Sequence, residues 1–216
     1  MICCSRYYMD SSVNDTINRT SNFFGELRSS MWKRRISKFV GCVGDWGVGK
    51  DSLVLKMLGM DIPVPKLEQD HPYVRRKSTS DIPDLKSNQH FDLTVRIIPG
   101  KYCNRARDEN FFDYLRPGDY DFDALVFCFD LNSTTSFINL EGKWIPKAKV
   151  ALGNTMPYFM VIGTKNDLPV VAINDYQEDC LKANIDHVHY SRCSVHNNVN
   201  IEPIRNMLLF LLSYKR

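Results

Sequence analysis

A stretch of eight residues, 44–51 (GDWGVGKD), has the glycine spacing and the lysine of a phosphate-binding loop. Glycines allow such a loop to turn tightly, so that successive backbone N–H groups point at a phosphate, and Lys50 would add a positive charge beside the outer phosphates. The pattern normally ends on Ser or Thr, whose hydroxyl binds Mg²⁺, but this chain has Asp51 there. The sequence therefore predicts a nucleotide site with altered metal chemistry.

The residues on either side of this loop have the patterns that a phosphate site needs. Residues 37–43 (SKFVGCV) are predicted to form a short strand, and residues 51–60 (DSLVLKMLGM) carry the apolar spacing of a helix. A loop that feeds the N-terminus of a helix offers unpaired N–H groups and a favourable dipole to an anion. The alternative interpretation is a glycine-rich turn in an unrelated α/β domain.

A second motif, residues 164–167 (TKND), directly follows a strand predicted over residues 157–163 (PYFMVIG). The carboxylate of Asp167 can accept both N–H groups on the edge of guanine, which adenine does not offer, and the stem of Lys165 can lie over the base. A site that pairs such groups rejects a base that leaves them unpaired. A polar loop after a strand is the plainer interpretation, but the spacing after the phosphate loop argues against coincidence.

With both motifs in place, the chain resembles the Ras superfamily of small GTPases over residues 38–212. Within it the likeness is to Rho- and Rab-like members and to the fungal septation and mitotic-exit branch. The resemblance implies an α/β fold, GTP or GDP as ligand and, in the family, Mg²⁺. Four further stretches carry it: residues 123–130 (DALVFCFD), the pairs Ser136-Phe137 and Lys143-Trp144, residues 193–195 (CSV), and residues 200–213.

The resemblance also implies which residues contact the nucleotide. Phosphate contacts fall on the loop and on one glycine further along the chain, and guanine contacts fall on the second motif and on the CSV stretch. The expected phosphate-binding residues are Gly44, Asp45, Trp46, Gly47, Val48, Gly49, Lys50, Asp51, Ser52 and Gly100, and the expected guanine-binding residues are Thr164, Lys165, Asp167, Ser194 and Val195.

Several positions depart from the family pattern. Trp46 stands where most members keep a glycine, and a side chain there obstructs the attacking water and an arginine finger. The family's metal-associated Asp is Ile97 here, and its water-orienting Gln is Lys101, although Gly100 fits. Because phosphoryl transfer depends on positioning and electrostatics, we expect hydrolysis to be impaired or absent, which leaves the enzyme assignment undecided. Residues 73–80 (YVRRKSTS) offer Ser78, Thr79 and Ser80 as candidates for the family's metal-sensing hydroxyl.

Asp51 has two opposite consequences for nucleotide binding. A bare contact between like charges costs about 4 kcal/mol at an effective dielectric of 20, which would weaken binding. A metal bridging Asp51 and the phosphates would reverse the sign, since carboxylates ligate Mg²⁺. Ser52 is a poor replacement for the missing hydroxyl, because one residue along a helix turns the side chain by about 100°.

The composition indicates one folded domain preceded by an extension. Apolar residues make up 44% and charged residues 25% of the 216-residue chain, as in ordinary globular proteins. Strand patterns alternate with amphipathic helix patterns from residue 37 onward, which predicts a three-layer α/β fold with a mostly parallel sheet and ligand loops at the carboxyl ends of the strands. The domain is expected to span residues 37–216.

Residues 1–36 are rich in Ser, Asn and Thr and show no sustained period. They hold six basic and three acidic residues, whereas the rest of the chain holds 22 of each, so the net charge of +3 lies in this extension. Basic residues 33–35 beside Trp32 suggest contact with an anionic membrane surface, and a solvated extension is the alternative. Without a recognised nucleic-acid-binding module, no nucleic acid partner is expected.

The seven cysteines are scattered without metal-ligand spacing, which favours a reducing compartment. Residues 207–212 are too few to span a membrane, and no signal peptide is recognised. We therefore expect a cytoplasmic protein, with peripheral membrane contact through residues 1–36 or lipidation of Cys3 and Cys4 as added options.

Two function classes follow. The first is a guanine-nucleotide-binding signalling or trafficking protein whose effectors and regulators contact residues 61–107. The second is a pseudo-GTPase, in which the same fold serves as an interaction scaffold with weak or no nucleotide binding. An adenine-nucleotide kinase is disfavoured by residues 164–167.

Overall fold

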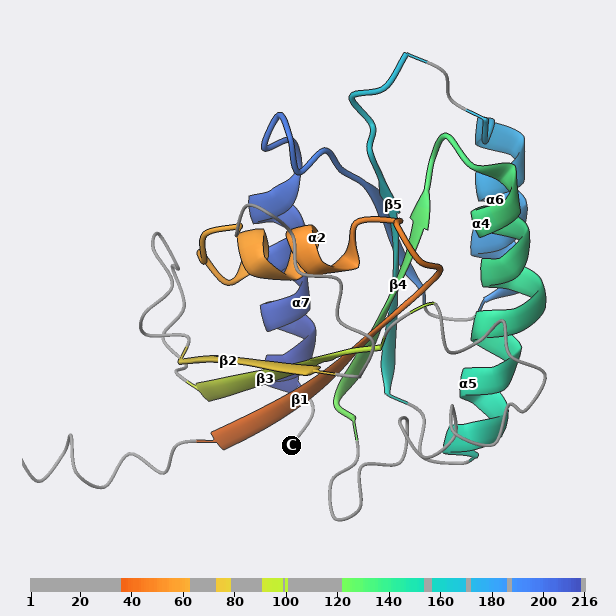
Figure 1. Ribbon diagram of the computed structural model, residues 1–216. Helices are drawn as coiled ribbons and strands as arrows, with labels where there is room; N and C mark the ends of the chain where they lie inside the picture. Colours follow the sequence, from red (N-terminus) through yellow and green to blue (C-terminus); the bar gives the residue numbers. More distant parts are fainter. Residues whose placement is uncertain are drawn as a thin grey trace, which may run out of the picture. The chain divides into compact units, whose positions relative to one another are not determined.

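Six strands form one sheet in the order β2-β3-β1-β4-β5-β6, in a computed structural model that describes residues 36–62, 73–78, 91–98, 100, 122–153, 157–169, 172–185 and 188–214 (Figure 1). Every neighbouring pair is parallel except β2 and β3, which are antiparallel. The strands are β1 (Ile36–Val43), β2 (Tyr73–Ser78), β3 (Phe91–Ile97), β4 (Ala124–Asp130), β5 (Tyr158–Thr164) and β6 (His189–Arg192).

Helices cover both faces of this sheet. Figure 1 shows α2 and α7 on one side and α4, α5 and α6 on the other, and two separate groups of buried apolar residues fill the spaces between the layers. Among the described residues the helices are α2 (Lys50–Met57), α4 (Thr134–Asn139), the π-helical turn η3 (Leu140–Trp144), α5 (Ile145–Leu152), α6 (Asp175–Asn184) and α7 (Ile201–Tyr214).

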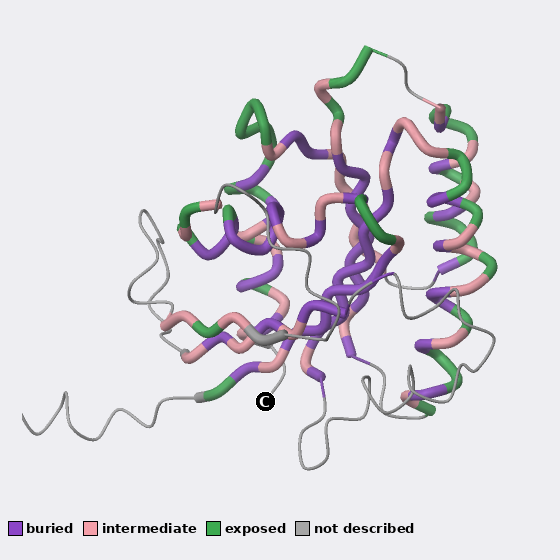
Figure 2. Tube along the Cα trace, viewed as in Figure 1, coloured by how far each residue is buried: buried purple, intermediate pink, exposed green. Residues whose placement is uncertain are grey.

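The central strands are buried on both faces, as their sequences require. Six successive residues of β4, 124–129, are buried, and so are the last six of β5, 159–164 (Figure 2). A strand with helices on both sides has no solvent face, so its sequence reads as a continuous apolar run. The predicted three-layer α/β fold is confirmed.

The predicted elements agree with the structure to within a few residues, with one clear correction. The helix predicted over residues 51–60 ends at Met57, because Gly59 adopts a φ of +64° and its N–H bonds to the carbonyl of Lys56. A left-handed glycine is a usual helix terminator. In the described part of the chain no helix is long and apolar enough to cross a membrane. Residues 1–35 lie outside the described residues, so the predicted boundary of the extension stays a prediction.

Candidate nucleotide site

The predicted phosphate loop leaves β1 and enters α2, as a phosphate site requires. Gly47 and Gly49 have φ of +77° and +90°, in the left-handed region that glycine adopts without strain. At Gly44 the restriction is space, because a Cβ atom there would lie 2.1 Å from the carbonyl oxygen of Cys128 on the neighbouring strand β4. Glycine is therefore needed at these positions for the loop to turn beside the sheet.

Lys50 lies inside the loop rather than in solvent. It is 5% exposed, and its Nζ donates hydrogen bonds to the carbonyl oxygens of Gly44 at 2.9 Å and Asp45 at 2.6 Å. Burial lowers the pKa of Lys50, and electrostatic interactions with Cys42 and Cys128, followed by Asp51 and Asp45, partly oppose this by raising it. The loop thus encloses one positive charge, which an anionic ligand would help to balance.

The Asp45 carboxylate is held by two residues far along the chain. Its Oδ2 accepts from Nδ2 of Asn139 at 2.7 Å, and its Oδ1 accepts from Nε1 of Trp144 at 2.8 Å. Trp144 is fully buried at the end of the π-helical turn η3. These bonds anchor the loop to the α4–η3 segment, whereas the next loop residue, Trp46, is 58% exposed.

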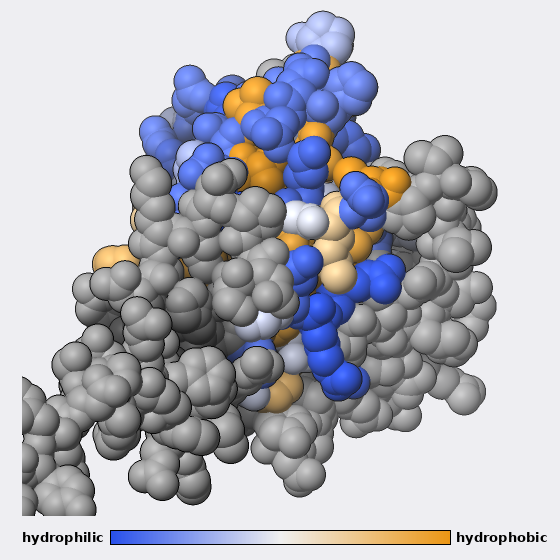
Figure 3. Space-filling model, turned by 90° about the vertical axis from the view of Figure 1, so that its left-hand side faces the viewer, coloured by the Kyte–Doolittle hydropathy of each residue, from blue (hydrophilic) through white to orange (hydrophobic). Residues whose placement is uncertain are grey.

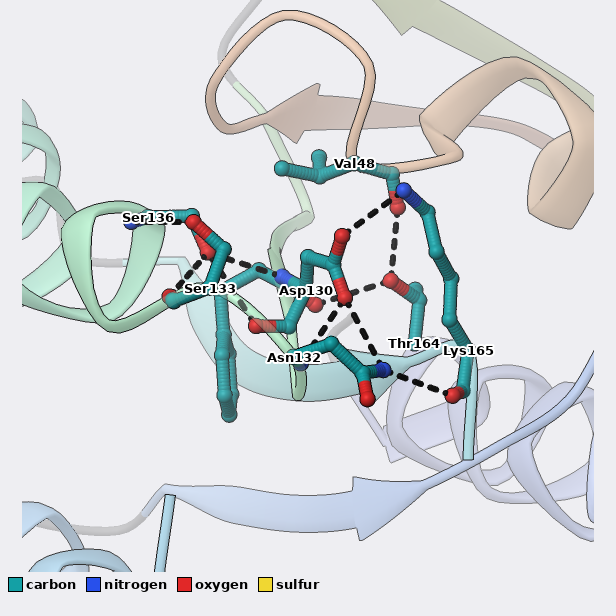
Figure 4. Close-up of polar contacts among 8 residues, drawn as sticks. Val48, Asp130, Asn132, Ser133, Ser136, Thr164 and Lys165 are labelled. Atoms are coloured by element: carbon teal, nitrogen blue, oxygen red, sulfur yellow. Dashed lines mark hydrogen bonds and ion pairs between the residues drawn. The ribbon is translucent and has the colours of Figure 1, made fainter. Parts of the chain in front are cut away.

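Thr164 joins the phosphate loop to the second motif. Its buried hydroxyl lies 2.6 Å from the carbonyl oxygen of Val48 and 2.8 Å from that of Phe129, so its single proton can be donated to either (Figure 4). The next residue, Lys165, has a φ of +59°, which is rare outside glycine. Its Nζ pairs with Oδ2 of Asp130 at 2.7 Å.

Asp130 and Asn132, which the sequence analysis did not single out, hold Lys165 in place. Asp130 accepts from the backbone N–H of Asn132 at 2.9 Å, and Nδ2 of Asn132 donates to the carbonyl of Lys165 at 3.0 Å (Figure 4). The position of Asp130 at the carboxyl end of the apolar strand β4 was the available signal, because ligand sites of parallel sheets gather at that edge.

The predicted guanine-binding residues lie together. Oγ of Ser194 donates to Oδ1 of Asp167 at 2.6 Å, and this hydrogen bond is the main cause of the lowered pKa of Asp167. The two loops are joined further by the N–H of Asn166, which bonds to the carbonyl of Cys193 at 3.0 Å. The Asp167 carboxylate is thus ionised and oriented at neutral pH.

A pocket of about 510 Å³ runs from the start of α2 to these loops, within the size range of small-molecule sites. It contains the predicted residues Gly49, Ser52, Thr164, Lys165, Asp167 and Val195. The sequence analysis missed Lys56, which lies one helical turn after Ser52 and so shares its face of α2, and the exposed His196 beside Val195. The described residues visible in Figure 3 are mostly hydrophilic, with small separate apolar areas.

Comparison with known proteins agrees with this geometry. A family model described as Ras family matches residues 106–211. The chain is 30% identical over 130 residues to "Ras-like GTP-binding protein RHO1" of Entamoeba histolytica, a match that covers 58% of this chain and 52% of that protein. The chain is a divergent member of the Ras superfamily of small GTPases.

Two further relatives carry Rho-related names. "Rho-related protein racL" of Dictyostelium discoideum is 29% identical over 132 residues, 61% of this chain and 59% of that protein. "Rho-related GTP-binding protein RhoH" of Mus musculus is 25% identical over 169 residues, 75% of this chain and 80% of that protein. The chain therefore spans little more than half the length of the first and second of these three relatives. The likeness to the septation and mitotic-exit branch stays a prediction.

The half of the site that handles the terminal phosphate and the metal departs from the superfamily pattern. Ile97 is a buried apolar residue at the end of β3, and Asp51 lies in the first turn of α2. Gly100 packs directly on the loop, since a Cβ atom there would lie 2.1 Å from the backbone nitrogen of Trp46. Pro99 and Lys101 lie outside the described residues.

Ser78, one of the three hydroxyls predicted as switch candidates, does not lie at the site. Ser78 pairs with Asp92, which pairs with Ser37 at the start of β1. The phosphate loop follows the other end of β1, so Ser78 lies about 20 Å away along the strands. Thr79 and Ser80 lie outside the described residues.

The residues present do not fit Mg²⁺ as the superfamily binds it. The first hydroxyl is replaced by a carboxylate at Asp51, and the acidic residue is replaced by the buried, apolar Ile97. The connection between α2 and β2, residues 58–72, contains no Ser or Thr. No group of three or more His, Cys, Asp or Glu side chains suited to a metal occurs within the described residues.

Proposed function

We propose that this protein binds guanine nucleotides and acts as a signalling or trafficking protein of the small-GTPase type, with impaired or absent hydrolysis. Two relatives are named as GTP-binding proteins. The observation that supports the proposal most is the pairing of Asp167 with Ser194 at 2.6 Å beside the pocket, because an oriented carboxylate matches the two N–H groups of guanine.

The positions of the two loops support the same proposal. The Thr164 hydroxyl lies within hydrogen-bond distance of the carbonyls of Val48 and Phe129 and can donate to either, which joins the guanine motif to the phosphate loop. Lys165 is paired with Asp130, which keeps its stem beside the pocket. Gly49 and Asp167 both line the pocket, so a nucleotide bound there would have its base beside Asp167 and its phosphates beside Gly49.

Slow hydrolysis is proposed because the groups that position water and stabilise charge are altered. Catalysis of phosphoryl transfer relies on an oriented water, metal charge and an arginine finger worth about 10³–10⁵ in rate. This chain has Lys101 in place of Gln and an exposed Trp46 on the loop, where it would obstruct an incoming arginine. Single-turnover conversion of GTP to GDP at ordinary small-GTPase rates would contradict this part of the proposal.

Calorimetric titration of the nucleotide-free full chain with GDP, GTP and ATP tests the binding. We expect micromolar or tighter affinity for a guanine nucleotide and none for ATP, and Asp167→Ala should lower the guanine affinity more than tenfold. Asp179→Ala is the matched control, since within the described residues this exposed aspartate pairs with Lys182 on its own helix α6. Failure of every guanine nucleotide to bind would refute the proposal.

A pseudo-GTPase scaffold is the second candidate, favoured by Asp51 and Ile97 at the metal positions. In that case the Asp167→Ala protein would still bind its partner proteins.

Effector or regulator contact through residues 61–107 belongs to both candidates, and these residues fall largely outside the described part. Cytoplasmic location with membrane contact through residues 1–36 is a separate proposal, and co-sedimentation of the full chain with vesicles containing anionic lipid tests it.

A further inference from the structure

The pocket holds the part of the predicted nucleotide site that would bind the base and the phosphates nearest to it, but not the position expected to bind the metal. It is lined by residues for the base and for the first phosphates, from Val195 and Asp167 to Ser52 and Gly49. Asp51, at the position of the superfamily's metal-binding hydroxyl, is not one of its lining residues.

Gly100 limits the space on the other side of the loop. Its Cα lies so close to the loop that an added Cβ would be 2.1 Å from the nitrogen of Trp46 and 2.4 Å from the carbonyl carbon of Asp45. Contacts of this kind with backbone atoms cannot be relieved by rotating a side chain. In this conformation no space remains between Gly100 and the loop at Asp45 and Trp46, so we infer that a third phosphate bound on this side would displace the Gly100 segment.

The charges at the loop also favour a short phosphate chain. Lys50 is enclosed by the loop, where its Nζ bonds to two loop carbonyls, and Asp51 follows it directly at the start of α2. Burial lowers the pKa of Lys50, and the charge of Asp51 is one of the smaller effects that raise it. Each added phosphate brings further negative charge towards Asp51. Because Asp51 and Ile97 replace the superfamily's metal-binding groups in the described part of the site, we do not expect a divalent cation to offset that repulsion.

Ser52 provides a neutral donor on the pocket side of α2. It is 6% exposed, it lines the pocket, and its hydroxyl has no hydrogen-bond partner among the described residues. A buried hydroxyl without a partner is unfavourable, and the first turn of a helix is where an anion is stabilised. A phosphate oxygen near Gly49 would accept from this hydroxyl and remove the deficit.

We propose that the site is selective for guanosine diphosphate over the triphosphate, that it binds the diphosphate without a divalent cation, and that the Ser52 hydroxyl is a phosphate-contacting residue. This inference rests on the proposed guanine-nucleotide function, and it specifies which nucleotide and which metal state that function uses.

The test is titration of the nucleotide-free full chain with GDP and GTP, each in EDTA and in excess Mg²⁺. The GDP affinity should change by less than about threefold between the two conditions, and GTP should bind at least about tenfold more weakly than GDP in both. Tightening of either nucleotide by Mg²⁺ of about tenfold or more, or equal affinities for GDP and GTP, would overturn the inference.

Two variants probe the residues that carry it. Asp51→Asn removes the carboxylate charge at nearly constant size, so the GTP affinity in EDTA should rise by about tenfold and approach that of GDP. Ser52→Ala should weaken GDP by about tenfold or more, as expected for loss of a hydrogen bond to a charged group. Ser213→Ala on α7 is the matched control, because in the described part of the chain its hydroxyl donates to the carbonyl of Phe210 on its own helix. Weaker GTP binding by Asp51→Asn in Mg²⁺ would show that Asp51 ligates the metal and would overturn the inference.

The outcomes separate the two proposals. If neither GDP nor GTP binds to the wild-type protein in either condition, the guanine-nucleotide function fails and this inference fails with it. If both bind only with Mg²⁺, the function stands and this inference alone is wrong.

Discussion

Replacing Thr164 with Val tests whether the two halves of the site are joined as the contacts indicate. The two side chains have nearly the same shape, so the substitution removes the hydroxyl and leaves the packing. The carbonyl oxygens of Val48 and Phe129, at 2.6 and 2.8 Å from that hydroxyl, lose their shared donor in a fully buried setting. An unsatisfied buried group costs about 1–3 kcal/mol.

For a domain of this size each kcal/mol corresponds to about 2–4 °C in Tm, so the Thr164→Val protein should unfold roughly 2–12 °C below the wild type. Thermal unfolding followed by circular dichroism on the nucleotide-free full chain measures this. Thr135→Val, an exposed position in α4, is the matched control and should leave Tm within about 2 °C of the wild type. Equal Tm values for the two variants would refute the assigned role of the Thr164 hydroxyl.

Three further predictions concern the loop and the guanine motif. Trp144→Phe removes the N–H donor to the Asp45 carboxylate at 2.8 Å and should lower the free energy of unfolding by about 1.5–3 kcal/mol in urea titrations; an unchanged midpoint would count against this anchor. The hydrogen bond from Ser194 lowers the pKa of Asp167 in the folded protein, so its carboxylate should stay ionised, and guanine binding should persist, as pH falls from neutral to the ordinary range of an aspartate near about pH 4; loss of guanine binding already above pH 5 would contradict this. Gly100→Ala should force this segment away from Trp46 and narrow the preference for GDP over GTP, and an unchanged ratio of the two affinities would contradict the close packing seen here.

Much of the fold follows from local sequence patterns. The continuous apolar runs in β4 and β5, 124–129 and 159–164, can be recognised because strands between two helix layers have no polar face. The loop at residues 44–51 and the motif at residues 164–167 can also be recognised from the sequence. Each is a short continuous segment whose own backbone and side chains are expected to contact the nucleotide.

Contacts between distant segments could not be predicted in the same way. The bonds from Asn139 and Trp144 to Asp45 depend on the π-helical turn η3, whose wider winding decides the direction in which Trp144 projects. The register of β2 is likewise set by its pairing with β3. In this register Ser78 lies beside the start of β1, at the end of the sheet opposite the phosphate loop. Neither relation leaves a periodic signal in the sequence.

The two edges of the sheet have a consequence for how the protein behaves at high concentration. Edge strands carry backbone groups that can pair with another molecule, and proteins oppose this with charged or very short edges. Among the described strands, β2 at one edge contains the basic run Arg75, Arg76 and Lys77, and β6 at the other edge is only four residues long. Extension of this sheet into a neighbouring copy is therefore opposed by charge repulsion at one edge and by a short pairing length at the other.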